Sequence, residues 1–245
     1  MQKTRDESKV KETRTALGCP GEGKPEAVWP VGAQSYIEIE DGILVEVIPD
    51  ETHLLEYILS ARNMDRAISR VVSNGGSGGV DHMPVGELRA YWAEHGGEIK
   101  KSILEGKYKP SAVRRVRIPK DNGKWRLLGI PVVVDRAIQQ ALAQVLTAIY
   151  EPQFSNSSYG FRPGRGAHDA INAAKEYLNQ GYEYGVGLDL ERFFDTISHS
   201  YTVQLLSRTI KDGRVIGLIH KYLKAGVMEG GLVKPTEAGA PQGSL

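Results

Sequence analysis

The sequence contains a single cysteine, Cys19, among 245 residues. One thiol cannot form an internal disulfide bond, and without neighbouring cysteines it lacks the partners of a structural zinc site. The six histidines are scattered without the spacing of metal ligands, and no Ser/His/Asp or Cys/His set for nucleophilic catalysis is recognisable. These absences exclude disulfide-rich and zinc-based folds and are consistent with a reducing compartment.

Long apolar runs and an excess of charge are also missing. No stretch approaches the roughly 20 apolar residues that cross a membrane, and the N-terminus, "MQKTRDESKVKETR", is too charged for a signal peptide. We therefore expect no membrane partner and a cytoplasmic protein. Lys and Arg number 31 against 30 Asp and Glu, so only local clusters of charge can indicate a nucleic-acid partner.

The chain divides into three predicted parts. Residues 1–50 mix charge, Gly and Pro and are expected to be a flexible leader with one isolated strand in "GILVEVIP". Residues 51–110 carry two helical patterns: one begins near His53 and ends at "SNGGSGG", and the other covers residues 85–104 as one helix or as two separated at Gly96-Gly97. Residues 111–245 form the third part.

This third part alternates helical and extended patterns. Two β-prone runs flank Asp121-Asn122-Gly123 and predict a hairpin. A helix follows over residues 134–150, with Asp135 placed to cap it. We then expect a loop, a helix ending near Gly181, a buried strand over residues 184–191, and two helices between residues 199 and 225. Because the order lacks a regular βαβ rhythm, the predicted class is α+β.

The predicted hairpin is strongly basic. Alternation along a strand would place Arg115 and Arg117 on one face and Arg114 on the other. A phosphate-binding surface and a solvated edge hairpin, protected from aggregation by its charges, both remain open. The cations are Arg114, Arg115, Arg117, Lys120, Lys124 and Arg126, against the single acid Asp121.

A second basic segment is the loop "YGFRPGRG", which contains Arg162 and Arg165 directly before a helix. Such a loop can bind phosphates or stack on bases. Taken alone, its Gly and Pro residues favour the simpler reading of a turn. "SNGGSGG" does not predict a phosphate loop, since no Gly-Lys-Ser/Thr follows it, and we interpret it as a hinge or linker.

Asp189 lies at the end of the predicted buried strand, in "GLDLERFFD". An ionised carboxylate in such a place is costly unless it is paired, hydrogen-bonded or bound to a metal. A divalent ion for phosphoryl or nucleotidyl transfer would satisfy it. A structural aspartate that caps the next helix would do so as well, and the spacing alone slightly favours this second reading.

Taken together, these stretches resemble the reverse transcriptases of group II intron-encoded proteins, the intron maturases. The resemblance covers roughly residues 54–245. The stretches that carry it are, in order, "LLEYILSARNMDRAISRVVSNGGSGGVDHM", "RRVRIPKDNGKWRLLGIPVVVDRAIQQALAQVLTAIYEPQFSNSSYGFRPGRGAHDAI", "DLERFFD", "KYLKAGVM" and "GAPQGSL".

The resemblance implies the fingers and partial palm of a right-hand polymerase, with an N-terminal helical region. By this resemblance, Asp189 is a catalytic, metal-binding aspartate and the carbonyl of Leu190 a further Mg²⁺ ligand. Phe193, or with less support Phe194, would contact the incoming sugar. Lys120, Arg126 and Gln242 would bind the nucleotide, and the implied RNA contacts are Arg114, Arg115, Arg117, Arg162 and Arg165.

The implied reaction is RNA-templated DNA synthesis, in which a primer hydroxyl attacks the α-phosphate of a dNTP and pyrophosphate leaves. The implied partners are group II intron RNA, an RNA template with a DNA primer, and dNTP, with a homodimer left open. The related enzymes would serve intron splicing and retrohoming as parts of mobile elements.

This sequence departs from the family pattern at its end. "GAPQGS" replaces Gly-Thr-Pro-Gln-Gly-Gly, "ISHS" replaces Asn-His-Asp, and the sequence stops before a Tyr-Ala-Asp-Asp motif. We therefore expect little or no polymerase activity from this chain by itself. A non-catalytic module that binds intron RNA, and a decayed reading frame without function, are the alternatives.

Overall fold

The computed structural model describes residues 36–40, 43–47, 53–119, 123 and 125–240. Near its start, β1 (Tyr36–Glu40) and β2 (Ile43–Val47) form an antiparallel pair. The strand expected in "GILVEVIP" is thus present, but it is paired rather than isolated. The remaining residues of the expected leader lie outside the described part of the chain.

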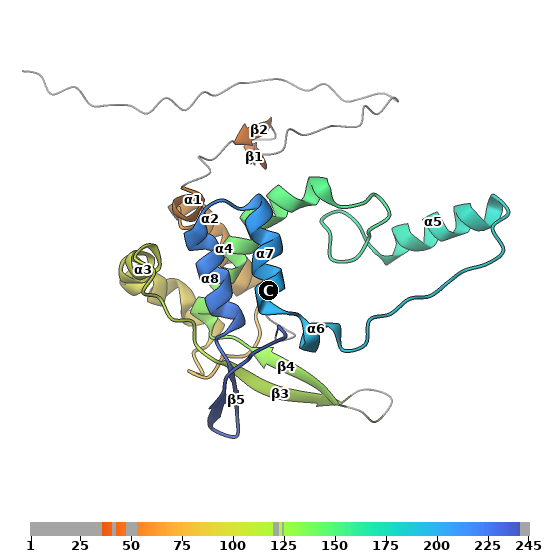
Figure 1. Ribbon diagram of the computed structural model, residues 1–245. Coiled ribbons are helices and arrows are strands. Elements are labelled where there is room, and N and C mark those ends of the chain that lie inside the picture. Colours follow the sequence, from red (N-terminus) through yellow and green to blue (C-terminus); the bar gives the residue numbers. More distant parts are fainter. Residues whose placement is uncertain (1–35, 41–42, 48–52, 120–122, 124, 241–245) are drawn as a thin grey trace, which may run out of the picture.

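Helices make up most of the described chain (Figure 1). The helical pattern that begins near His53 forms two helices, α1 and α2. The segment after Pro84 is one continuous helix through Gly96-Gly97, preceded by a short 3₁₀ turn. The helices are α1 (Leu54–Ile58), α2 (Ala61–Asn74), η1 (Val85–Glu87), α3 (Leu88–Leu104), α4 (Val133–Tyr150), η2 (Glu151–Gln153), α5 (Ala167–Asn179), α6 (Phe193–Thr196), α7 (His199–Thr209) and α8 (Gly213–Leu223).

A four-stranded mixed sheet lies below these helices in Figure 1. Its strands are β3 (Val113–Pro119), β4 (Trp125–Ile130), β5 (Val227–Glu229) and β6 (Leu232–Lys234), in the order β4-β3-β5-β6. The β3–β4 pair is the predicted hairpin, and Gly123 in its turn has a φ of +75°. β5 runs parallel to β3 and antiparallel to β6. Helices with a mixed sheet confirm the α+β class.

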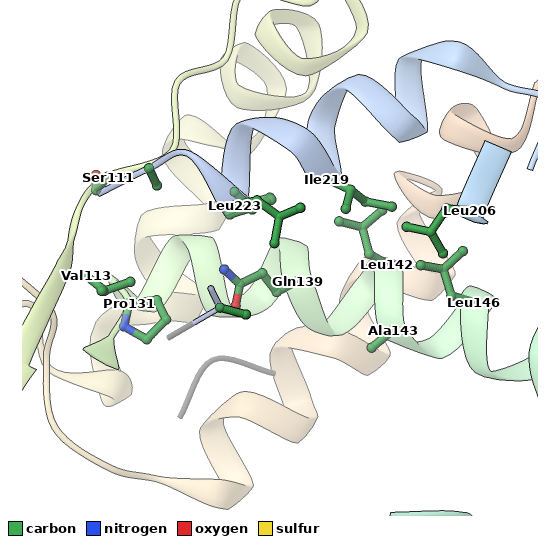
Figure 2. Close-up of a pocket in the computed structure, with 13 residues that line it drawn as sticks. Ser111, Val113, Pro131, Gln139, Leu142, Ala143, Leu146, Leu206, Ile219 and Leu223 are labelled. Carbon is green, nitrogen blue, oxygen red and sulfur yellow. The ribbon is translucent and has the colours of Figure 1, made fainter. Parts of the chain in front are cut away.

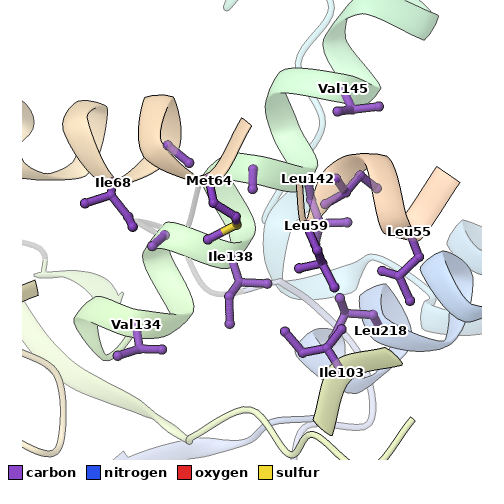
Figure 3. Packing of buried hydrophobic residues seen from close by; sticks show 14 of the residues in the cluster. Leu55, Leu59, Met64, Ile68, Ile103, Val134, Ile138, Leu142, Val145 and Leu218 are labelled. Atoms are coloured by element: carbon purple, nitrogen blue, oxygen red, sulfur yellow. The ribbon is translucent and has the colours of Figure 1, made fainter. Parts of the chain in front are cut away.

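The hydrophobic core lies between α1, α2, α4 and α8, with Ile103 from α3 (Figure 3). Each helix turns an apolar stripe inward: α2 contributes Met64 and Ile68, and α4 contributes Ile138 and Leu142. Both pairs are four residues apart, which is part of the helical spacing that predicted these helices. The core therefore holds together elements far apart in the sequence and forms the base from which the hairpin extends.

Asn63 is a buried polar residue inside this core. Its Nδ2 donates hydrogen bonds to the carbonyls of Ile58 (2.8 Å) and Ala141 (3.1 Å), and its Oδ1 accepts one from Gln144 Nε2 (2.7 Å). Because both ends of the amide have partners, burial carries no unsatisfied polar group. Asn63 thus links α1, α2 and α4.

Asp135 does not cap α4 as expected from its position. Helix α4 has Val132 at its N-cap and no side-chain cap. The buried Asp135 carboxylate instead accepts hydrogen bonds from the hydroxyls of Tyr108 (2.7 Å) and Tyr222 (3.0 Å) and from the backbone N–H of Ser111 (2.9 Å). These tertiary donors take the lone pairs that a cap would have used, so Asp135 joins α4, α8 and the segment entering β3.

The glycine-rich segment after α2 is anchored rather than acting as the expected hinge or linker. Arg114 donates two hydrogen bonds to the carbonyl of Gly78, and Arg136 donates to the carbonyls of Gly75 and Ser77. A Cβ at Gly79 would lie 2.5 Å from Val132 Cα, so only glycine allows this close backbone approach. The segment thereby ties the helical region to the base of the hairpin.

Candidate nucleic-acid and metal-binding site

The arginines of the hairpin lie on two faces, as strand alternation predicted. Arg117 is opposite Leu127, whereas Arg126 is opposite Ile118 and shares a face with Arg114. Arg114 binds the carbonyl of Gly78, and Arg126 is exposed. Lys120 and Lys124 lie outside the described residues. The hairpin therefore presents cations to solvent in two directions.

Arg117 is held by an acidic residue of the neighbouring strand. Its Nη2 lies 2.8 Å from Glu229 Oε1, and Lys234 Nζ lies 3.5 Å from the other carboxylate oxygen. The hydrogen bond from Arg117 lowers the pKa of Glu229. The pair is exposed, so its contribution to stability is small, but it fixes the direction of the guanidinium.

The two arginines of "YGFRPGRG" are used inside their own loop. Arg162, whose side chain is 7% exposed, donates to the carboxylate of Glu151 and to the carbonyls of Ser155 and Ser158. Arg165 donates to the carbonyl of Asn156 at 2.5 Å. Multiple donors on planar guanidinium groups suit this convergence of carbonyls. The loop is therefore held in one shape by the residues expected to contact RNA.

The expected buried strand over residues 184–191 is not a strand, and it is not buried. The segment is extended and exposed, with Tyr184 95% and Leu188 94% accessible. In Figure 1 it runs beside no other strand on its way from α5 to α6. A strand is stable only with a partner, and no described segment pairs with this one. The prediction was wrong because an apolar pattern indicates only that the segment favours an extended backbone. A strand also needs a neighbouring strand with which to pair.

Asp189 is accordingly exposed, and no hydrogen bond or ion pair joins it to another described residue. The desolvation argument that motivated a metal partner does not apply to this geometry. No group of three His, Cys, Asp or Glu side chains among the described residues could hold a metal ion. Asp189 and the carbonyl of Leu190 supply too few ligands for Mg²⁺. The described residues thus do not fit a complete Mg²⁺ site.

Phe193 and Phe194 are the first two of the four residues of the short helix α6, and their rings meet edge to face with centroids 5.7 Å apart. Both rings are partly exposed. The backbone N–H of Ala240 donates to the carbonyl of Phe194 at 2.7 Å. The segment leading to "PQG" is therefore docked on α6, beside the expected sugar contact, while Gln242 itself lies outside the described residues.

His199 fixes the same junction. Its Nε2 lies 2.7 Å from the carbonyl of Gly239, and the histidine is buried. The neighbouring Gly239 N–H donates to the carbonyl of Ile197 at 2.8 Å. Gly239 has a φ of +84°, and a Cβ there would meet the carbonyl of Phe194 at 2.9 Å. The sequence alone did not suggest a role for this histidine. Only its position shortly after the two phenylalanines could have indicated one.

A cavity of about 240 Å³ lies between α4 and α8 (Figure 2). Its walls are mostly apolar, and the Oε1 of Gln139 is buried there without a hydrogen-bond partner among the described residues. The lining residues include Gln139, Leu142, Leu206, Ile219, Leu223 and Ala240. No cation of the hairpin lines it, so the cavity does not have the chemistry of a triphosphate site.

Among the described residues, none of the helices combines the length and the apolar character of a membrane-spanning segment.

Two features near the hairpin were missed in the sequence. Trp125, at the start of β4, is 60% exposed, although a large aromatic residue is usually mostly buried. The β5–β6 hairpin was also missed, despite the Gly230-Gly231 pair that forms its turn. The turn signal was visible, but the three-residue strands are too short for a pattern of alternation.

Comparison with known proteins agrees with this architecture. Residues 118–245 match the family model "Reverse transcriptase (RNA-dependent DNA polymerase)". Protein YkfC of Escherichia coli (strain K12) is 38% identical over 171 residues, which make up 68% of this chain and 45% of that protein. The group II intron-encoded protein LtrA of Lactococcus lactis subsp. cremoris is 40% identical over 149 residues, or 60% of this chain and 25% of LtrA.

The chain thus spans less than half the length of these two relatives. A solved structure, "Partial Cas6-RT-Cas1--Cas2 complex", has a similar fold: the TM-score is 0.52, with 21% sequence identity, and the match covers 78% of this chain and 32% of that chain. At this identity the likeness concerns the fold alone. It agrees with the α+β polymerase fold expected from the sequence.

Proposed function

Because this chain belongs to the reverse transcriptase (RNA-dependent DNA polymerase) family, we propose that it forms the fingers and the first part of the palm of a group II intron-encoded enzyme. Such an enzyme would copy intron RNA into DNA and serve splicing and retrohoming. The observation that carries the proposal is the basic β3–β4 hairpin mounted on the helical base. The similarity to LtrA supports it.

The proposed roles follow from chemistry at each position. Arg126 is exposed on the hairpin, where its charge can bind the triphosphate together with Lys120. Phe193 on α6 would contact the sugar of the incoming nucleotide. Gln242 would line the nucleotide pocket, close to the segment that docks on α6. The RNA would meet the exposed Arg117 and other cations of the hairpin.

Asp189 is proposed as a metal ligand of the complete enzyme. Reverse transcriptases generally use Mg²⁺, which supplies stabilisation of the attacking and leaving oxygens when it is bound. The described residues contain no group of three His, Cys, Asp or Glu side chains that could hold a metal ion, and a two-ion site needs more ligands than Asp189 supplies. We therefore derive no step through the metal and infer that this polypeptide alone extends primers little or not at all.

Primer extension tests this inference directly. The purified 245-residue chain would be incubated with an RNA template, a DNA primer, all dNTPs and Mg²⁺, and no extension above background is expected. Template-dependent extension would refute the inference of inactivity. In a longer polypeptide that carries these residues and extends primers, Asp189→Ala should abolish extension and leave RNA affinity nearly unchanged. Glu183→Ala, in the same exposed segment, is the matched control.

A non-catalytic RNA-binding module is the second candidate. Two observations favour it: Asp189 is exposed and has no partner among the described residues, whereas the hairpin carries arginines on both of its faces. If it is correct, Asp189→Ala is harmless even in a longer active polypeptide, whereas Arg115→Ala weakens RNA binding and reduces its dependence on salt. Salt titrations of RNA affinity, measured beside primer extension, separate the two. Absence of RNA binding by the folded wild-type chain would favour a reading frame without function. Light scattering of the purified chain would decide whether it forms a homodimer, which the resemblance left open.

A further inference from the structure

One face of the four-stranded sheet has a composition that the roles above do not explain. Strand pairing sets which side chains share it: Arg117 lies opposite Leu127, and Glu229 lies opposite Leu232. The parallel pairing of Val113 with Val227 places β3 and β5 residues of odd number on the same side. We call this side the tryptophan face, defined by Arg115, Arg117, Trp125, Leu127, Glu229, Leu232 and Lys234.

Large apolar side chains on this face are open to solvent. Trp125 is 60% exposed, Leu127 is also exposed on β4, and Leu232 on β6 is 70% exposed. An apolar sheet face is normally covered by another layer, yet the outer end of this one is open. Three strand spacings of about 4.8 Å separate β4 from β6, which makes the platform about 14 Å wide.

The charges on this face are mainly positive. Arg115, Arg117 and Lys234 outnumber the single acid Glu229. Glu229 contacts Arg117 and Lys234, and so places two cations between the apolar side chains of β4 and those of β6. Only one terminal nitrogen of Arg117 is used in this pair, and the guanidinium keeps further N–H groups for an anion.

Flat apolar rings among fixed cations recognise a chain that carries both exposed rings and negative charges. Single-stranded RNA has both, since its unstacked bases can lie on an aromatic side chain while the phosphates meet arginine and lysine. In a duplex the base faces are stacked on one another and cannot reach a tryptophan. An acidic peptide would use the cations but would leave the ring of Trp125 unused.

We propose that the tryptophan face binds single-stranded RNA, with a base stacked on Trp125 and the backbone phosphates bound by Arg117 and Lys234. Leu127 and Leu232 extend the platform on either side. The inference rests on the proposed function and deepens it by naming the form of RNA and the surface. Arg126 lies on the opposite face of the hairpin, so the RNA segment on the tryptophan face would be one other than the templating base, which has to pair with the nucleotide.

The test measures RNA affinity by fluorescence anisotropy with the full 245-residue chain. The probes are a labelled, unstructured uridine-rich 12-nucleotide RNA and an RNA duplex of equal length. Stacking contributes about 1–3 kcal/mol per base, so Trp125→Ala should weaken single-strand binding roughly 5- to 150-fold. Trp125→Phe should keep most of the affinity. Ile118→Ala is the matched control, because Ile118 is an exposed apolar residue on the opposite face.

Salt dependence separates stacking from charge. Trp125→Ala should leave the slope of log affinity against log salt unchanged, whereas Arg117→Ala should reduce it by about 0.7. Circular dichroism of each variant verifies folding, which the exposure of Trp125 should preserve. Equal losses on single strand and duplex, or full competition by a polyglutamate peptide, would overturn the proposal.

The outcome also distinguishes this inference from the proposed function. Wild-type affinity for RNA with no effect of Trp125→Ala rejects the tryptophan face and leaves the reverse transcriptase proposal standing. No binding of either RNA by the folded wild-type chain rejects both. Selective loss of single-strand binding in Trp125→Ala, with Ile118→Ala unchanged, is the result expected.

Discussion

The hydroxyl of Tyr108 donates a 2.7 Å hydrogen bond to the buried carboxylate of Asp135, which also accepts one from Tyr222. Burial raises the pKa of Asp135, and the three donors around it oppose this shift without cancelling it. Burial likewise raises the pKa values of both tyrosines. This cluster connects the base of the hairpin to α8 and makes the stability of that connection depend on pH.

The sign of the dependence follows from linkage. A carboxyl group with a raised pKa binds its proton more tightly in the folded state, so its favourable contribution is complete below the ordinary pKa near 4 and is lost as pH rises through the folded value. Asp135→Asn cannot titrate. The free energy of unfolding of the wild type minus that of Asp135→Asn should therefore decrease between pH 4 and pH 7, measured by urea unfolding. A difference that grows with pH would contradict this account.

Gly79 should be among the least replaceable residues of the helical region. A Cβ there would lie 2.5 Å from the backbone of Val132, so Gly79→Ala must displace either the glycine-rich segment or the start of α4. Overpacking of this kind costs about 1–3 kcal/mol or more, to be measured by urea unfolding. Gly86→Ala is the control, because a Cβ at Gly86 meets nothing within 4 Å, and its effect should stay within about 0.5 kcal/mol.

Local signals predicted most of the fold. The Asn-Gly turn of the β3–β4 hairpin and the helical spacing in α2, α4 and α8 depend on neighbours in sequence, and the structure contains each of these elements. The alternation of Arg114 and Arg115 across the hairpin was predictable for the same reason. The alternation of side chains along a strand follows from local backbone geometry and does not depend on the rest of the molecule.

Features that depend on distant partners were not predictable. Asp135 stands in a capping position by sequence, but Tyr108 and Tyr222 come from elements far along the chain and take its oxygens. The apolar pattern of residues 184–191 predicted a strand, yet no described strand pairs with it. The predicted burial of Asp189 was wrong for the same reason, because no other described element covers a side chain at the end of an unpaired segment.

Asn63 should contribute strongly to the packing of α1 against α4. Asn63→Ala leaves the buried carbonyls of Ile58 and Ala141 without their side-chain donor. Each unsatisfied buried group costs about 1–3 kcal/mol, so the free energy of unfolding should fall by about 2 kcal/mol or more. Asn172→Ala, at an exposed position of α5, should change it by less than about 0.5 kcal/mol. Equal effects of the two would refute the role assigned to Asn63.

Arg162 should control the local stability of its loop more than that of the whole chain. Its guanidinium donates in several directions, to Glu151, Ser155 and Ser158, whereas lysine carries one ammonium group that cannot reproduce this planar set. Arg162→Lys should therefore accelerate hydrogen exchange of the backbone amides over residues 155–166 at least about tenfold, corresponding to about 1.4 kcal/mol of local stability. Exchange in the core helices α2 and α4 should stay unchanged, since Arg162 contacts neither. Arg70→Lys, at an exposed position of α2, should leave loop exchange as in the wild type; equal protection of the loop in Arg162→Lys would show that the turn residues alone hold its shape.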